Sequence, residues 1–458
     1  MSGIIGIWSE TRDVAADLYF GLVALQHRGQ ESCGIAVTKD LEVSFHKDMG
    51  LANDVFDLFK LSELKGSMGI GHVRYSVQGE SGRENTQPLV LKYFKGGLCI
   101  ALNGTIVNAD ALREEFSKAG AIYQTTSDTE VLAYAIAQAR TETGSVEDAL
   151  NQAMKNLWGA YALVITSPRK IIAAKDPWGF RPLAMGRKGN DIIFASETSA
   201  LDCLGAEFER ELDPGEIVVV KDGKAVSIRD NCGSKKTNFC IFEYIYFARP
   251  DSVIHGRLVN DARRMSGRLL AKDSPVDADI IISVPESGIP AAVGFAQESG
   301  IPLEEGLFKN RYITRTFITP EQTSREAAVL LKLNPIKEYV RGKRVCMVDD
   351  SLVRGTTMQV IAKALRDAGA AEVHARISSP SFLWPCYFGT DVKNRDQLLA
   401  ANYTDKETAR LIGADSLAYL RVERLKEIMP ERTELGFCQA CFTGEYPIDV
   451  HSLSGGAK

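Results

Sequence analysis

The stretch that decides the fold of this chain reads VCMVDDSLVRGTT and covers residues 345–357. Its first four residues are apolar, which is typical of a strand buried on both faces of a parallel sheet. Two acids, Asp349 and Asp350, end the run, and a loop with Gly355 leads into residues 358–368, where apolar residues recur at helical spacing. A strand, an acidic tip, a loop and a helix in this order favour a phosphate site, because a helix N-terminus presents unpaired N–H groups.

The residues of this loop are suited to a phosphorylated sugar. Gly355 lets the backbone approach a phosphate, and Thr356 and Thr357 add hydroxyl donors. Asp349 and Asp350 stand at the carboxyl end of the expected strand, where they can accept from ribose hydroxyls or hold Mg2+ through water. From these residues alone, an ordinary junction whose acids cap the helix is an equally good interpretation.

The complete string is more specific. It resembles the phosphoribosyl pyrophosphate (PRPP) motif of type I phosphoribosyltransferases, in the form found in the glutamine PRPP amidotransferase family. The resemblance implies an α/β domain that binds PRPP through the residues of this loop: Asp349, Asp350, Ser351, Arg354, Gly355, Thr356 and Thr357.

A second strand–loop–helix unit comes earlier in the chain. Residues 278–285 form an apolar run, and the loop 286–288 ends it. In the phosphoribosyltransferases that the chain resembles, this loop holds pyrophosphate. The resemblance therefore adds Ser287 and Gly288 to the PRPP site, and Ser287 to the two acids as a Mg2+ ligand. The structural alternative is a tight turn that needs Gly288 for its backbone angles.

A basic segment, residues 309–318, resembles the flexible loop that closes over PRPP in this family, and it contains Arg311. A basic lid neutralises phosphate charge and excludes water. Without the neighbouring motifs, a solvated charge run is the better interpretation.

The first half of the chain is rich in expected strands. Residues 2–8 read as a strand, and strands dominate residues 160–220, so we expect stacked sheets with helices. A strand that begins near residue 99 is expected to end at an Asn103-Gly104 turn. Taken in order, these segments resemble the glutaminase domain of the class II, N-terminal-nucleophile amidotransferases.

This second resemblance implies a role for several residues. Arg74 binds the α-carboxylate of glutamine and Asp128 its α-ammonium group. Asn103 and the Gly104 N–H form the oxyanion hole, where donors face the developing charge. The alternatives are a surface ion pair for Arg74, a helix cap for Asp128 and a plain hairpin turn for the Asn-Gly pair.

The chain departs from the family at the catalytic position, because Ser2 stands where the family has cysteine. In the family, the residue exposed by removal of the first methionine attacks the amide, and its own amine is the base. Three interpretations remain open: an engineered replacement, a natural relative that uses free ammonia, or a slow serine nucleophile. We favour a silenced or greatly slowed glutaminase. Cys33 has no attached α-amine and is expected in the core.

Four cysteines have surroundings that resemble the cluster-bearing branch of the family: Cys240, Cys386, Cys438 and Cys441. From the residues alone, four thiolates suit either Zn2+ or an iron–sulfur cluster. The resemblance implies a [4Fe-4S] cluster.

Composition excludes several classes of protein. The chain has 458 residues, 45% of them hydrophobic, and a net charge of −5, which argues against a nucleic-acid surface. The sequence shows neither an apolar run long enough to span a membrane nor a secretory signal, so we expect a cytoplasmic enzyme. Nine cysteines in so long a chain do not suggest a disulfide scaffold.

The expected architecture is an α+β N-terminal-nucleophile glutaminase domain over residues 2–232 and an α/β type I phosphoribosyltransferase domain over residues 233–458. The resemblance implies formation of 5-phosphoribosylamine from PRPP and glutamine or ammonia, with Mg2+ as a cofactor. It also implies that purine nucleotides act as feedback inhibitors and that the protein forms a dimer or tetramer. The alternatives are a natural ammonia-dependent relative and a non-catalytic regulator that binds PRPP or nucleotides. The PRPP motif excludes a sugar-phosphate aminating synthase, a family that shares the glutaminase half but lacks this motif.

Overall fold

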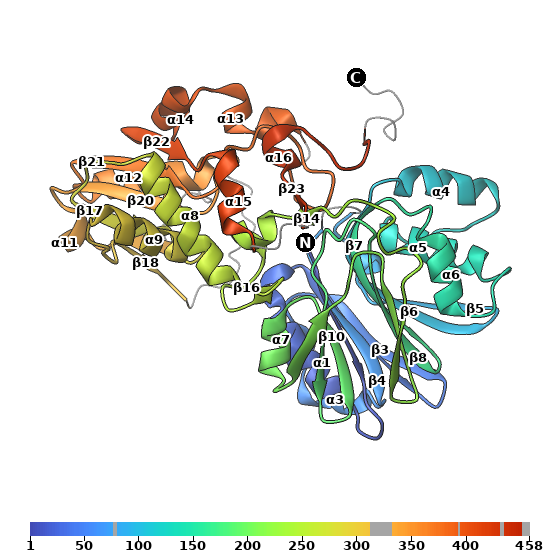
Figure 1. The fold of residues 1–458 in the computed structure, drawn as a ribbon. Coiled ribbons are helices and arrows are strands. Elements are labelled where there is room, and N and C mark those ends of the chain that lie inside the picture. The colour runs from blue at the N-terminus through green and yellow to red at the C-terminus, as the bar shows by residue number, and fades with distance from the viewer. Residues whose placement is uncertain (77–79, 312–331, 393, 431–434, 451–458) are drawn as a thin grey trace.

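Two lobes of different architecture make up the chain, and the amino terminus lies between them (Figure 1). The computed structural model describes residues 1–458 except 77–79, 312–331, 393, 431–434 and 451–458. Residues 312–318 of the predicted flexible loop (309–318) lie outside the described residues.

The first lobe contains two antiparallel sheets. In sheet order, the seven-stranded sheet consists of β11 (Glu207–Glu211), β9 (Ala184–Lys188), β10 (Asp191–Ala195), β1 (Gly3–Trp8), β4 (Met68–Arg74), β2 (Ser32–Lys39) and β3 (Glu42–Met49). The six-stranded sheet consists of β13 (Lys224–Ile228), β12 (Ile217–Lys221), β8 (Lys170–Lys175), β7 (Gly159–Ser167), β6 (Gly96–Ile106) and β5 (Leu89–Tyr93).

The two sheets pack face to face, with helices on both outer faces. Ile4 of β1 and Val164 of β7 belong to the core between the sheets, whereas Ile5 packs against α1 (Ala15–Ala24) and α7 (Thr198–Cys203). This alternation follows from the two-residue period of a strand. The outer face of the second sheet is covered by α4 (Ala109–Lys118), α5 (Asp128–Ala139) and α6 (Val146–Ala153). The predicted stacked-sheet lobe is confirmed.

The second lobe is built on a parallel sheet. Its strands, in order, are β17 (Ile280–Ser283), β20 (Arg344–Asp349), β21 (Glu372–Ile377) and β22 (Ser416–Tyr419). One face packs on α8 (Val259–Asp273) and α9 (Ile289–Ser299), and the other on α12 (Thr356–Asp367) and α14 (Asp405–Ile412). Because helices cover both faces, β20 is apolar without alternation, as the sequence predicted.

The predicted turn at Asn103-Gly104 is wrong. β6 runs straight through both residues, and Gly104 pairs with Tyr161 of β7. Gly104 has φ +138°, and a Cβ there would lie 1.9 Å from the carbonyl oxygen of Ala160. The glycine is therefore required by a close strand approach rather than by a reversal of the chain.

Candidate functional site

A cavity of about 940 Å³ opens where the two lobes meet. Both phosphate loops of the second lobe contribute to its lining: Pro285, Glu286, Ser287, Asp349, Ser351, Leu352, Val353, Arg354, Gly355, Thr356 and Thr357. The first lobe adds Met1, His27, Arg28, Gln30 and Tyr75. The structure thus brings together the two loops that the sequence assigned to one ligand.

Gly355 shows why this loop can enclose an anion. It has φ +75° and directly precedes α12, so that residues 356 and 357, which line the cavity, begin the helix. Arg354 is held at the rim by Gln397, whose Oε1 accepts from its NH2 at 2.8 Å. Arg311 is exposed and does not contribute to the described lining, although Lys309 does.

Asp349 and Asp350 lie side by side at the end of β20. Burial, and then the charge of Asp350, raise the pKa of Asp349 well above its usual range. Burial also raises the pKa of Asp350, although hydrogen bonds from Ser287 and Ser351 oppose that change. Asp350 is buried and Asp349 is half-buried in the cavity wall, and two such carboxyls in contact favour a cation between them and a ligand, which fits the predicted role of this pair.

Gly288 lies beside these acids and does not need unusual backbone angles, because its φ is −75°. A Cβ at this position would lie 2.7 Å from the Val348 carbonyl oxygen and 2.8 Å from that of Val284. The structural explanation in terms of backbone angles is therefore wrong, and close packing of the loop on β20 replaces it. Gly288 is not part of the cavity lining, whereas Ser287 is.

A second, smaller cavity of about 20 Å³ lies in the first lobe. Its lining contains four of the residues predicted for glutamine: Ser2, Arg74, Gly104 and Asp128. Asn103 is buried next to them, and its Oδ1 accepts from the Ser2 N–H at 3.2 Å. Asn103 Nδ2 has no hydrogen-bond partner within the described part of the chain, so this donor is available to a ligand.

The charged residues of this cavity are held by their neighbours. Arg74 donates to Glu31 at 2.8 Å, and the Ser76 N–H donates to the same carboxylate at 3.0 Å. The sequence did not single out Glu31, since one acid after the HRGQ segment carries no pattern. Burial raises the pKa of Asp128 to about 6, although its carboxylate accepts from the Ile106 N–H.

The two cavities are adjacent. Met1, Tyr75 and Gly389 contribute to the lining of both. Ser2 lies at this border, and its Oγ accepts from the Tyr75 N–H at 3.3 Å. Cys33, by contrast, is fully buried in β2, where burial raises the pKa of its thiol to about 12, in agreement with the expected core position.

The four cysteines of the predicted cluster come together from three segments. β14 (Phe239–Cys240) pairs with β23 (Phe437–Cys438), which places Cys240 opposite Cys438. The Leu383 N–H donates to the Cys441 carbonyl at 3.0 Å, so the segment that leads to Cys386 adjoins the fourth cysteine. Burial and then the three other thiols raise the pKa of Cys441 well above its usual value.

Two negative findings apply to the described ranges. They contain no group of three or more His, Cys, Asp or Glu side chains that could hold a metal ion. They also contain no helix long and apolar enough to cross a membrane.

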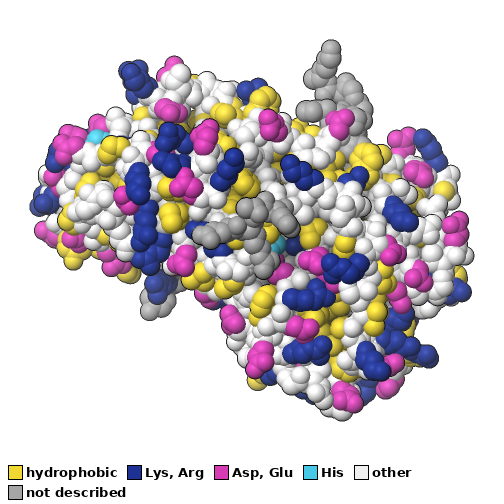
Figure 2. All heavy atoms as spheres, in the orientation of Figure 1, with side chains coloured by type: hydrophobic (Ala, Val, Ile, Leu, Met, Phe, Trp, Pro, Cys, Tyr) yellow, Lys and Arg dark blue, Asp and Glu magenta, His cyan; other side chains and the backbone are white. Residues whose placement is uncertain are grey.

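On the face drawn in Figure 2, Lys and Arg side chains are interspersed with Asp and Glu side chains over both lobes.

Comparisons with known proteins cover nearly the whole chain. A glutamine amidotransferase domain family matches residues 72–203, and a phosphoribosyl transferase domain family matches residues 254–378. An amidophosphoribosyltransferase of Methanocaldococcus jannaschii is 45% identical, with 98% of each chain covered. The enzyme of the same name from Synechocystis is 48% identical over 98% of this chain and 91% of its own.

A solved structure has the same fold. The glutamine PRPP amidotransferase from B. subtilis, complexed with ADP and GMP, is 44% identical, covers 98% of both chains and superimposes with a TM-score of 0.91.

The raised pKa of Asp128 gives a prediction for glutamine binding. The carboxylate must be ionised to take an ammonium group, so binding should weaken as pH falls through about 6. Between pH 7 and pH 5, the Kd for glutamine, measured by calorimetry, should rise by roughly tenfold. Asp128→Asn should bind weakly at both values, and a pH-independent Kd in the unaltered protein would contradict this role.

Proposed function

The chain belongs to the amidophosphoribosyltransferase family, and from this premise we propose how its two lobes share the reaction. An amidophosphoribosyltransferase replaces the pyrophosphate of PRPP by nitrogen from glutamine. The products are 5-phosphoribosylamine, pyrophosphate and glutamate, in the first committed step of purine biosynthesis. The observation that best supports a division of labour between the lobes is the shared border of the two cavities, which lets nitrogen released in one react in the other.

The larger cavity is proposed to bind PRPP. The loop 351–357 and the start of α12 supply N–H and hydroxyl donors to its phosphates, and Ser287 lines the same cavity. Gly288 and Arg311, which do not line it, are proposed as further members of the site on the family resemblance alone. Asp349, Asp350 and Ser287 would hold Mg2+, which usually takes one or two carboxylates together with substrate phosphates. The raised pKa values of both acids fit a site that a cation completes. When bound, Mg2+ would stabilise the charge of the departing pyrophosphate.

The smaller cavity is proposed to bind glutamine. Arg74 and Asp128 hold its charged end, and Asn103 Nδ2 with the Gly104 N–H receives the oxyanion. Met1 stands at the border of both cavities. Its removal, which the small side chain of Ser2 permits, would free the amine of Ser2 and enlarge a cavity that now measures only about 20 Å³.

The serine hydroxyl is a much weaker nucleophile than a thiol, so glutaminase activity is proposed to be absent or slow. Ammonia bypasses this attack, and PRPP amination from ammonium should remain. The arrangement of every other pocket residue is consistent with a single change at Ser2. The relatives quoted above are named as enzymes and give no support to a non-catalytic regulator.

The four cysteines are proposed to hold one [4Fe-4S] cluster with a structural role. A single ion needs all its thiolates within about 2.3 Å, whereas a cluster spreads its four ligands over separate irons. The proposal is supported by the way the segments converge: Cys240 lies opposite Cys438 in the strand pair, and the three other thiols help to raise the pKa of Cys441.

The remaining expectations stay proposals. Purine nucleotides, such as those in the B. subtilis complex, are proposed as inhibitors of this chain. A cytoplasmic homo-oligomer, either dimer or tetramer, is also proposed. The lobe boundary near residue 232 is a proposal that agrees with the sandwich strands ending at Ile228 and with β14 beginning at Phe239.

Asp350→Asn should lower ammonia-dependent formation of phosphoribosylamine strongly, because a cation ligand at the end of β20 is lost. Its melting temperature should not fall below that of the unaltered protein, since an amide at this position avoids the cost of a buried carboxylate next to Asp349. Unchanged turnover at saturating PRPP and Mg2+ would contradict the assignment.

Protein purified without oxygen should be brown and contain about four irons per chain. Cys441→Ser should lose most of this iron, whereas Cys203→Ser, on an exposed thiol of α7, should keep it. Stoichiometric zinc without iron would exclude the cluster.

Ser2→Cys should restore glutamine-dependent activity, because a thiol replaces the hydroxyl in an otherwise complete pocket. The unaltered protein should use ammonium at a similar rate to the variant but glutamine hardly at all. Equal rates with glutamine and ammonium in the unaltered protein would show that Ser2 is a working nucleophile.

A further inference from the structure

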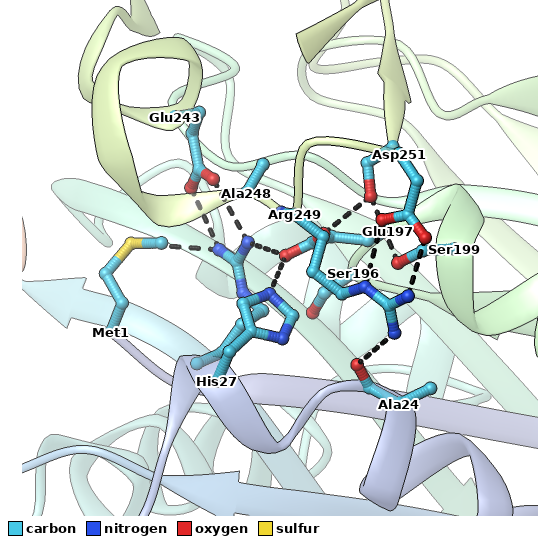
Figure 3. A network of polar contacts seen from close by, with 12 residues as sticks. Met1, Ala24, His27, Ser196, Glu197, Ser199, Glu243, Ala248, Arg249 and Asp251 are labelled. Atoms are coloured by element: carbon cyan, nitrogen blue, oxygen red, sulfur yellow. Dashed lines mark hydrogen bonds and ion pairs between the residues drawn. The ribbon is translucent and has the colours of Figure 1, made fainter. Parts of the chain in front are cut away.

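A fully buried arginine joins the two lobes behind the amino terminus. Arg28 is the last residue of η1 (Gln26–Arg28), and its side chain has no exposed area. Its NH1 donates to Glu197 at 2.6 Å and to Glu243 at 3.0 Å, and its NH2 donates to Glu243 at 2.9 Å. Figure 3 labels Glu243, Glu197 and His27 within this network of polar contacts.

The third nitrogen of Arg28 reaches the catalytic position. Its Nε donates to the backbone carbonyl of Ser2 at 3.1 Å. A guanidinium group is planar and rigid, so the paired contacts with Glu243 also set the direction of Nε. The Ser2 carbonyl is therefore held by Arg28, and the orientation of Arg28 depends on Glu243 of the other lobe.

Glu243 is well placed for this task. It begins η3 (Glu243–Phe247), whose later residues Tyr246 and Phe247 line the larger cavity. Glu197 has further partners, because it also accepts from Ser252 Oγ at 2.6 Å and from the Arg249 N–H at 2.9 Å. Loss of Glu243 would thus leave Arg28 charge-paired with Glu197 but without the fork that aims it.

We propose that Arg28 is a positioning residue for the glutaminase reaction, and that Glu243 of the second lobe holds it in its working orientation. The inference rests on the glutaminase role proposed for the smaller cavity. Its consequence is that the phosphoribosyltransferase lobe supports the geometry of the nucleophile in the glutaminase lobe. Neither residue touches the parts of glutamine that Arg74 and Asp128 are proposed to bind.

The test uses the full-length Ser2→Cys protein with PRPP and Mg2+, and adds Glu243→Gln. The kcat for glutamate release should fall by about tenfold to a hundredfold, as expected for a misplaced reacting group. The KM for glutamine and the ammonia-dependent rate should stay within about twofold, because their proposed binding groups are unchanged. Alkylation of the introduced thiol by a glutamine-like chloroketone should slow to the same extent as kcat.

Glu211→Gln is the matched control. Glu211 is a half-buried carboxylate that pairs across the same junction, with His255 Nδ1 at 3.0 Å, and it is not among the hydrogen-bond partners of Arg28 within the described part of the chain. It should leave kcat and the alkylation rate unchanged. If Glu243→Gln does not fold, Arg28→Lys should show the same loss of kcat, since lysine keeps the charge but lacks the fork.

An unchanged kcat in Glu243→Gln, or an equal fall in the glutamine-dependent and ammonia-dependent rates, would overturn the inference. Failure of the Ser2→Cys parent to hydrolyse glutamine would instead overturn the proposed glutaminase role. In that event the alkylation rates still decide whether Glu243 positions the terminal residue.

Discussion

The structure depends on the central place of β1 in the seven-stranded sheet. This strand pairs with β10 on one side and β4 on the other, and it begins at Gly3. An amino terminus usually frays because nothing holds it. Here the pairing of β1 with its neighbours fixes the chain from Gly3 onward, directly after Ser2. Ser2 is consequently delivered to one point, between Asn103, the Tyr75 N–H and Arg28.

Electrostatics explains the character of both cavities. Asp128 in the smaller cavity is buried and Asp349 in the larger one is half-buried, and the pKa values of both carboxyls are raised mainly by loss of solvent. Each is thus more costly in the ligand-free protein than an exposed acid, and each gains from a positive partner. The partners proposed are an ammonium group for Asp128 and a Mg2+ ion for the acidic pair. Arg28 differs, because its counter-ions belong to the protein and hold it permanently.

The junction between the lobes combines packing with function. Phe180 stacks on Phe388 across it with ring centroids 4.6 Å apart, and both belong to one small core cluster. Cys386 and Cys438 pack against that same cluster. The cysteine site therefore lies against the junction rather than at a remote end of the second lobe. The proposed [4Fe-4S] cluster, if bound there, would stabilise the segment that places Gly389 at the border of the two cavities.

Local sequence patterns were enough to predict some of the elements. Strand and helix periodicity, together with one glycine in a loop, were enough to predict three features. These are the apolar run of β20, the acids at its end and Gly355 at the start of α12. The predicted turn at Asn103-Gly104 was wrong because the glycine was taken as a sign of a turn. The glycine is instead required by the close approach of the neighbouring strand β7. Glu31, Arg28 and Glu243 were not assigned a role, since a buried ion pair brings together residues far apart in the chain and leaves no spacing pattern. Tertiary structure alone decided that the two cavities share Met1, Tyr75 and Gly389, because only the packing of the lobes brings these three residues together.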